Sequence, residues 1–469
     1  MKKLWWILLW GLVGCTGATA PESDAVGDDN QPVGSAQYDP EVADAVLSAA
    51  CSWPLVSDPD FLNVALPDLG ATYWVAVVPA IPGTRVRIEG QYPGARYFSF
   101  NAYTPLLSAV DRLTDYQIAP VVAGANPFRS TGAAAGGRYV AYVSQQTIPE
   151  QREPNTLYAG ELPLTADVSL ENNPIQILIY RVYLGEESIS GGVPLPVLTL
   201  ESDDGQRALL TLDMTNCVSL PPSELLPDLL TQAIAEYSAP QALLDLFTTF
   251  PLPLSAEDPT LQRHYSFPET LRSNLSAAFG FDLPGQSIAT GAAVDLLNNL
   301  DNAYMQALLT RDKSSMYIVR GKAPVAAIDP IGAPLGSAQL RYWSVCTNEI
   351  LTQRFADCAH DAQVALDRDG YFTVVVSDAA HRPDNVIRDN GMTWLAWGGV
   401  YPDSLFLYRH MLPSSHFAEA IQNIPLNTDP ASVMGEYYPG VEYCDRNTVE
   451  AAGNDPAAVF AACVARNDS

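Results

Sequence analysis

The chain has 469 residues, of which 48% are hydrophobic and 17% are charged. This length is enough for two or three domains with sizeable cores. The formal net charge is −28 at pH 7. Such a charge repels the phosphate backbone of nucleic acids, so we expect no nucleic-acid partner.

The first fifteen residues predict where the protein is located. Lys2 and Lys3 precede an apolar run, Leu4 to Val13, which is too short to span a bilayer and is typical of a signal peptide. The run closes on Leu12-Val13-Gly14-Cys15, which resembles the lipobox of bacterial lipoproteins. This resemblance implies that residues 1–14 are removed and that Cys15 carries the lipid. The alternative is an ordinary secretory signal that is cleaved elsewhere.

Residues 15–37 predict a flexible acidic tether. They contain mostly Thr, Gly, Ala, Pro, Ser and Asp, so they bury too little apolar surface to offset the entropy cost of ordering. In lipoproteins of two-membrane bacteria, an Asp after the cysteine tends to retain the protein in the inner membrane. Thr16 stands there instead. We therefore expect a lipid-anchored protein of the bacterial cell envelope, with the outer membrane favoured and the membrane as its partner through the lipid.

Two stretches, residues 38–220 and residues 312–416, predict β-domains that repeat one another. The offset is 231 residues between Tyr73 and Tyr304, and 245 residues between Arg96 and Arg341. The short β-branched and aromatic runs that correspond are Arg85–Gly90 and Tyr317–Gly321, Ala95–Ser99 and Leu340–Ser344, Gly137–Ser144 and Gly370–Ser377, and Ile177–Arg181 and Leu405–Arg409. Such runs are typical of antiparallel strands. We expect an α+β, mainly β fold with two duplicated β-sandwich or jelly-roll-like domains.

Residues 221–311, between these domains, predict a helical segment. Apolar residues recur there at the three-and-four spacing of an amphipathic helix. They are Leu225, Leu226, Leu229, Leu230 and Ile234, and then Leu296, Leu297, Leu300, Tyr304 and Leu308. We expect three or four helices in this segment. Residues 417–469 predict a C-terminal segment with short helices.

The cysteine content favours disulfides. There are seven cysteines, and six remain for pairing if Cys15 carries the lipid. Spacing suggests the pairs Cys51 with Cys217, Cys346 with Cys358, and Cys444 with Cys463, although six cysteines allow about 15 pairings. An oxidising compartment permits such bonds. Because no Cys-x-x-Cys is present, a zinc site is disfavoured, and we expect neither a metal nor a cofactor.

Several motifs of the second half carry a resemblance. They are Asn302-Ala303-Tyr304, Arg341-Tyr342-Trp343-Ser344, Gly370-Tyr371-Phe372, Trp394-Leu395-Ala396-Trp397 and the run Leu407 to Pro413. The chain resembles an uncharacterised group of secreted bacterial lipoproteins. More distantly, it resembles the paired jelly-roll-like domains of unknown function numbered twelve fifty-four and twelve fourteen. The resemblance implies a β fold, and it implies no activity because the family has none that is settled.

Whether the protein is an enzyme stays open. The common hydrolase, metalloprotease and nucleotide-binding motifs are absent, but a triad can assemble from distant loops. His410, with Arg409 beside it, follows a strand, and His381 shares a polar loop with Asp378. These four are candidate catalytic residues for acid–base chemistry. The alternatives are a hydrogen-bonded corner for His410 and a solvated turn for the loop.

Candidate ligand-binding residues combine arginine with aromatic rings. They are Arg96, Tyr97, Arg341 and Trp343 in the repeated strand, and Trp394 and Trp397 in a glycine-flanked loop. Arginine beside an aromatic ring can hold a carboxylate, and loop tryptophans can line a site for sugars or lipids. The alternative is that these residues simply pack. We expect a protein that binds a small molecule, a glycan or another protein, and the alternative is an extracytoplasmic hydrolase or other enzyme around His381 and His410.

The lipid anchor can be tested by labelling cells with a radioactive fatty acid. We expect label on the wild-type protein and none on Cys15→Ala, because the thiol of Cys15 is the predicted attachment point. The readout is label per amount of immunoprecipitated protein. Equal labelling of both proteins would contradict the anchor.

Overall fold

The computed structural model describes residues 52–57, 66–79, 83–103, 109–130, 132–160, 175–211, 259–264, 299–327, 337–349, 354–399 and 401–468. The predicted signal peptide, the tether with Cys15, and the pair Cys51 with Cys217 lie outside these residues.

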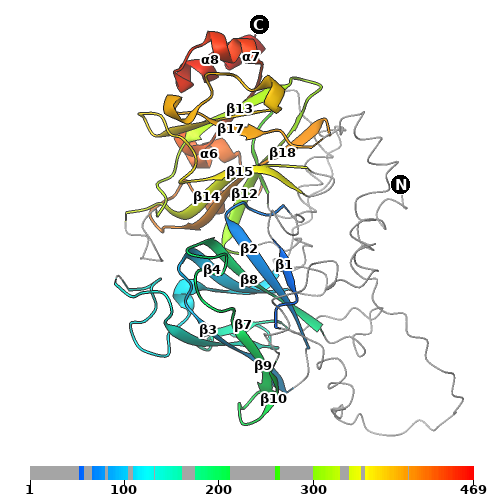
Figure 1. Ribbon diagram of the computed structural model, residues 1–469, viewed down its shortest axis with the longest axis vertical. Coiled ribbons are helices and arrows are strands. Elements are labelled where there is room, and N and C mark those ends of the chain that lie inside the picture. The colour runs from blue at the N-terminus through cyan, green and yellow to red at the C-terminus, as the bar shows by residue number, and fades with distance from the viewer. Residues whose placement is uncertain are drawn as a thin grey trace, which may run out of the picture.

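The first domain is a β-sandwich of two sheets, which occupies the lower half of Figure 1. Within the described residues, the strand orders are β1-β2-β8-β4-β5 and β10-β9-β3-β6-β7. The strands are β1 (Leu55–Ser57), β2 (Ala71–Pro79), β3 (Thr84–Gln91), β4 (Ala95–Tyr103), β5 (Ala109–Thr114), β6 (Arg138–Ser144), β7 (Thr156–Tyr158), β8 (Ile175–Gly185), β9 (Val197–Ser202) and β10 (Ala208–Thr211), with a 3-10 helix η1 (Asp115–Gln117) after β5. All neighbours pair antiparallel except β6 and β7, which are parallel.

The second domain is also a sandwich, with the strand orders β11-β12-β18-β14-β15 and β17-β16-β13-β19. The strands are β11 (Gln262–His264), β12 (Asn302–Thr310), β13 (Met316–Lys322), β14 (Leu340–Asn348), β15 (Phe355–His360), β16 (Tyr371–Ser377), β17 (Thr393–Ala396), β18 (Asp403–Pro413) and β19 (Gly440–Cys444). The helices are η3 (Ala379–His381), η4 (Arg388–Asn390), η5 (Ile421–Asn423), α6 (Pro430–Met434), η6 (Gly435–Tyr437), α7 (Arg446–Ala451) and α8 (Pro456–Asn467).

The two domains share one topology. Raising each strand number by ten converts the order β1-β2-β8-β4-β5 into β11-β12-β18-β14-β15, and β9-β3-β6-β7 into β19-β13-β16-β17. The parallel pair β6 with β7 of the first domain also has its counterpart in β16 with β17. The mainly β fold with two sandwich domains is confirmed, and the strand order agrees with the repeat in the sequence.

The helix expected through Tyr304 and Leu308 is wrong. Both residues lie in β12, which pairs with β18 along its whole length. The side chains of this strand alternate between the core and the outer face of the sheet; those that face the core are Ala303, Met305, Ala307 and Leu309. Apolar residues at three-and-four spacing over so few positions are compatible with a strand as well as with a helix. Here the residues form a strand, because they pair with β18. β11 is likewise a strand within the segment that we expected to be helical.

The C-terminal segment contains the short helices α6, α7 and α8, and it also supplies β19 to the second domain. Asp429, Asp445 and Asp455 precede these helices and accept hydrogen bonds from backbone N–H groups of their first turns, which satisfies donors that a helix start leaves unpaired. Among the described residues, no helix is long and apolar enough to cross a membrane.

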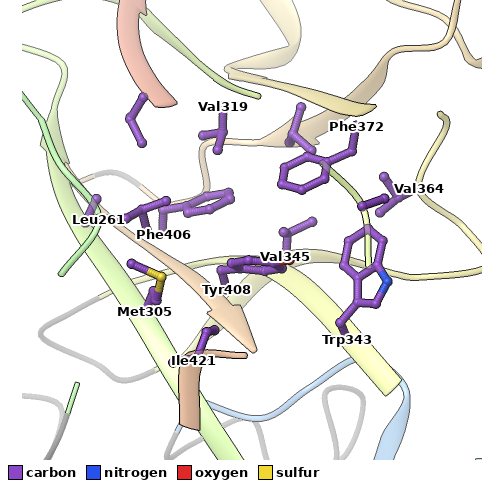
Figure 2. Close-up of a cluster of buried hydrophobic side chains, with 14 of the residues drawn as sticks. Leu261, Met305, Val319, Trp343, Val345, Val364, Phe372, Phe406, Tyr408 and Ile421 are labelled. Carbon is purple, nitrogen blue, oxygen red and sulfur yellow. The ribbon is translucent and has the colours of Figure 1, made fainter. Parts of the chain in front are cut away.

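Aromatic rings fill the core between the two sheets of the second domain, as Figure 2 shows. The Trp343 ring from β14 lies 5.5 Å from Phe372 of β16 and 6.0 Å from Tyr408 of β18, measured between ring centroids. The indole Nε1 of Trp343 donates to the Pro324 carbonyl at 3.0 Å. Trp343, a candidate ligand-binding residue, therefore belongs to the core.

Two of the three predicted disulfides are confirmed. Cys346 and Cys358 join β14 to β15, and Cys444 and Cys463 join β19 to α8. The first bond links directly opposed residues of neighbouring strands, and the second fixes the C-terminal helix to the edge of its sheet.

The core role of Trp343 can be tested by urea unfolding. Trp343→Ala removes a ring that is 1% exposed, and we expect it to lower the free energy of unfolding by about 3–5 kcal/mol. Leu366→Ala is the control, because that side chain is 46% exposed and its loss should cost within about 0.5 kcal/mol. Similar costs for the two variants would contradict the assignment.

Candidate functional site

The two domains meet through the outer faces of one sheet from each. Strands β4 and β8 of the first domain lie against β12 and β14 of the second (Figure 1). Buried residues of both domains form one cluster here, namely Ala71, Tyr97, Tyr183, Tyr342 and Met411. We call this contact the domain interface. It contains three of the six candidate ligand-binding residues: Arg96, Tyr97 and Arg341.

Arg96, at the start of β4, pairs with an aspartate of the other domain. Its Nη1 lies 2.5 Å from Oδ1 of Asp361, and the two side chains are 11% and 2% exposed. The other carboxylate oxygen of Asp361 accepts the backbone N–H of Trp343 at 3.2 Å. The carboxylate is thus held by its own domain while it binds the arginine across the interface.

Arg341, at the start of β14, makes the corresponding contact in the opposite direction. Its Nη1 lies 3.3 Å from Oδ2 of Asp115, and both side chains are buried. Oδ2 of Asp115 also accepts the backbone N–H of Phe98 at 3.2 Å. Burial raises the pKa of Asp115 to about 6, although Arg341 opposes this shift.

Tyrosine hydroxyls reach across the domain interface as well. The Tyr97 hydroxyl donates to Oδ2 of Asp301 at 2.8 Å and lies 3.3 Å from Oδ1 of Asn299. The Tyr342 hydroxyl donates to Oδ1 of Asp68 at 2.6 Å. Asp68 and Asn299 belong to the short segments that precede β2 and β12, so each segment is held by a tyrosine of the other domain.

Arg409, a candidate catalytic residue, lies on β18 at the centre of the domain interface. Its Nη1 is 3.6 Å from Oδ2 of Asp68, and its Nη2 donates to the Leu66 carbonyl at 2.8 Å. Ser344 donates to the same Asp68 oxygen at 2.5 Å. Arg409 is 3% exposed, so its charge is used to hold the two domains together.

His410 is buried in the core on the opposite face of the same strand. Its Nδ1 accepts the backbone N–H of Ile421 at 3.2 Å, and its ring makes an edge contact with Tyr408 at 4.7 Å. Burial lowers the pKa of His410 to about 3, so the ring is neutral at physiological pH. His410 thus has a structural role, as in the alternative that we considered, but it lies inside β18 and not at a corner after the strand.

The other two candidate catalytic residues belong to a surface loop after β16. His381 is exposed in η3. Asp378 accepts two hydrogen bonds from Arg311, at 2.6 Å and 3.2 Å. Because Arg409 faces the domain interface, His410 faces the core and His381 faces solvent, the structure does not bring the four candidate residues into one site.

The two tryptophans that we expected in one loop have different surroundings, and the expectation is wrong for Trp394, which lies in β17; Trp397 directly follows this strand. Trp397 is 1% exposed, and its ring lies 5.0 Å from Tyr317 and 5.0 Å from the guanidinium of Arg311. Trp394 stays partly exposed. Its Nε1 donates to the Ser377 hydroxyl at 3.0 Å, and the guanidinium of Arg382 lies over its ring at 4.9 Å. Of this pair, Trp394 is the one that can contact a ligand.

A possible metal-ligand set lies beside the domain interface. In the described part of the chain, ligand atoms of Asp68, Cys346 and Cys358 lie within 4.8 Å of one another. The two cysteines form a disulfide, and the Nη1 of Arg409 lies 2.7 Å from the Sγ of Cys346. Disulfide sulfur lacks the thiolate charge that binds metals, and the guanidinium repels cations, so these residues do not suit a metal.

The aspartates of the domain interface were not identified from the sequence. Asp115 directly follows β5 and Asp361 directly follows β15, so they occupy corresponding places in the two repeats. The two aspartates are 246 residues apart, one more than the offset of 245 in the strands before them, so extending the repeat without a shift pairs Asp115 with His360. With a shift of one residue, Asp111 and Asp115 correspond to Asp357 and Asp361, and the strand order agrees that β5 and β15 are equivalent.

Comparisons with known proteins find distant structural likeness. Neither a model of a protein family nor a curated protein matches the chain. An uncharacterised protein from Burkholderia cenocepacia is similar over 87% of this chain and 86% of its own, with 12% identity and a TM-score of 0.44. A protein from Vibrio parahaemolyticus is similar over 81% and 90%, with 11% identity and a TM-score of 0.34. Neither likeness bears on function.

The buried state of His410 predicts a pH dependence of stability. Because its folded pKa of about 3 lies below the unfolded value near 6.5, the unfolded chain binds the extra proton as the pH falls between these values. The contribution of His410 to the free energy of unfolding should therefore drop by about 2 kcal/mol from pH 7 to pH 5.

The measurement is chemical unfolding of wild type and of His410→Gln at both pH values. We expect the variant to lose less stability than the wild type over this interval. His416→Gln removes an exposed histidine and serves as the control, with wild-type behaviour. An unchanged pH dependence in His410→Gln would show that another group is responsible.

Proposed function

We propose that the protein is a lipid-anchored protein of the bacterial cell envelope, at the outer membrane, that binds a ligand or partner with its two β-domains. The N-terminal sequence supports the anchor, and we propose that the chain belongs to the secreted group that it resembles. The two disulfides support a location outside the cytoplasm, because the cytoplasm keeps thiols reduced.

The observation that carries the binding role is the exposed pair of Arg382 and Trp394. Arg382 is exposed, Trp394 is partly exposed, and the guanidinium lies over the indole at 4.9 Å. Trp394 packs against a buried cluster of the second domain, and its hydrogen bond to Ser377 fixes the ring. A fixed indole loses little entropy when it binds, which favours affinity.

The surroundings of this pair are also rigid. Trp394 lies in β17, which pairs in parallel with β16. The loop after β16 is fixed by the ion pair of Asp378 with Arg311. The same guanidinium donates to the Gly398 carbonyl at 3.2 Å, which fixes the loop after β17. An aromatic ring on a paired strand with a guanidinium over it suits the apolar face of a sugar ring or a planar small molecule.

The proposed role can be tested by thermal-shift measurements with a panel of sugars, fatty acids and peptides. A ligand at about 100 times its Kd should stabilise the folded protein by about 2.7 kcal/mol. We expect Trp394→Ala and Arg382→Ala to reduce this shift strongly. Tyr116→Ala is the control, because Tyr116 is an exposed aromatic residue of the first domain, and it should keep the full shift. A panel without any shift would contradict the proposal.

A further inference from the structure

The connection between β5 and β6 in the first domain is longer than its counterpart in the second domain. It spans residues 115–137, whereas the connection between β15 and β16 spans residues 361–370, less than half as many. We call residues 115–130, which the structure describes without a gap, the β5–β6 loop. The loop is drawn in cyan at the left of the lower domain in Figure 1. One repeat therefore carries a surface element that the other lacks.

Buried side chains fix the path of this loop. Asn126, which is 1% exposed, donates through Nδ2 to the Asp115 and Ile118 carbonyls at 2.9 Å and 2.7 Å. Its Oδ1 accepts the backbone N–H of Phe128 at 2.7 Å. The Phe128 ring is itself buried in the core of the first domain. The β5–β6 loop therefore has a defined shape, although it forms no strand.

Two adjacent valines are exposed at a turn of the β5–β6 loop. The backbone N–H of Val121 donates to the Arg138 carbonyl at 2.9 Å, and that of Ala125 donates to the Val122 carbonyl at 3.1 Å. Gly124 takes a φ of 82° in this turn, a conformation that glycine adopts without steric cost. Val121 is 59% exposed and Val122 is 67% exposed, more than any other large hydrophobic side chain among the described residues. A fixed turn thus holds two apolar side chains in water.

The charge around these valines is opposite in sign to that of the whole chain. Residues 116–149 contain no Asp or Glu, although the chain has 53 of them. Among the described residues, the partners of Arg129 are two backbone carbonyls, which do not neutralise its charge. The Arg138 side chain is 70% exposed and lies 3.8 Å from Glu89, which Arg87 also binds at 2.8 Å. A positive charge therefore remains beside the valines.

Apolar side chains flanked by arginines match the surface of a bilayer that contains anionic lipid. Interfacial protein segments place apolar residues at the boundary between headgroups and acyl chains, and their cations are attracted to the lipid phosphates. The formal net charge of −28 repels such a surface from the rest of the molecule. A protein partner would also cover the valines, but the acid-free stretch with its two arginines favours anionic phosphates.

We propose that the β5–β6 loop is a membrane-contact site. Val121 and Val122 enter the interfacial region of an anionic bilayer, and Arg129 and Arg138 lie at the level of the lipid phosphates. This contact is separate from the predicted lipid anchor and from the proposed ligand site in the second domain. On an anchored chain it sets which side of the first domain faces the membrane, because a tether alone leaves the orientation free.

The test measures binding to vesicles by the processed chain that the sequence predicts, residues 15–469, with Cys15→Ala so that no lipid is attached. The vesicles contain equal parts of phosphatidylethanolamine and anionic phosphatidylglycerol, and binding is measured by co-sedimentation at increasing lipid concentration. We expect this chain to bind, and Val121→Ser/Val122→Ser to weaken binding at least about tenfold, because less apolar surface is buried. Val121→Leu/Val122→Leu should strengthen binding by about fourfold for each added methylene group, a gain that a structural role of the valines would not produce.

The role of charge is tested with Arg138→Gln. We expect about fivefold weaker binding to the anionic vesicles, because one cation near the membrane surface is lost. On vesicles of phosphatidylcholine, which carry no net charge, the same variant should bind as the unsubstituted chain does. Equal binding to the anionic vesicles with and without Arg138→Gln would overturn the part assigned to charge.

The matched control is Ile189→Ser/Val325→Ser. These side chains are 57% and 56% exposed and lie outside the β5–β6 loop, so their loss should leave vesicle binding unchanged. All variants should melt within about 3 °C of the unsubstituted chain, because the side chains are exposed. Absence of binding to the anionic vesicles, or equal binding with and without Val121→Ser/Val122→Ser, would overturn the proposal. Since the tested chain carries no lipid and no ligand is added, neither result depends on the proposed anchor or binding role.

Discussion

The arrangement of this molecule depends on the buried ion pairs between its two sandwiches. Arg96 with Asp361 and Arg341 with Asp115 are withdrawn from water at opposite places of the domain interface. Such pairs add little net stability compared with apolar contacts, but loss of one partner costs about 3–5 kcal/mol, because it leaves a buried charge alone. Their main effect is to fix the relative orientation of the domains, since other orientations would leave these charges unpaired.

This constraint changes how the candidate residues are understood. The arginine beside an aromatic residue in both repeats predicted a ligand-binding site. In the structure, Arg96 and Arg341 each bind a carboxylate of the neighbouring domain. Arg409 holds Asp68 in the same way. The ligand site that we propose therefore lies away from these residues, where Arg382 after η3 lies over Trp394 of β17.

The sequence was informative about the fold because strand patterns and repeats depend on local residue types. The runs around Tyr97 and Tyr342 predicted equivalent strands, and β4 and β14 are such strands. The same local reasoning failed at Tyr304 and Leu308, where pairing with a distant strand decided the structure. It could not identify Asp68 or Asp301 as interface residues, because their partners lie more than 200 residues away in the chain.

The two halves of the molecule differ in the segments that precede β2 and β12. The segment before β2 offers the carboxylate of Asp68 to Tyr342, whereas the segment before β12 offers the amide of Asn299 to Tyr97 at the equivalent place. Arg409 receives the negative charge of Asp68, which Asn299 could not supply. The carboxylate of the segment before β12 is that of Asp301, which also accepts the Tyr97 hydroxyl, at 2.8 Å. The two segments are therefore not interchangeable: Asp68 serves both Tyr342 and Arg409, whereas Asn299 and Asp301 share the Tyr97 hydroxyl.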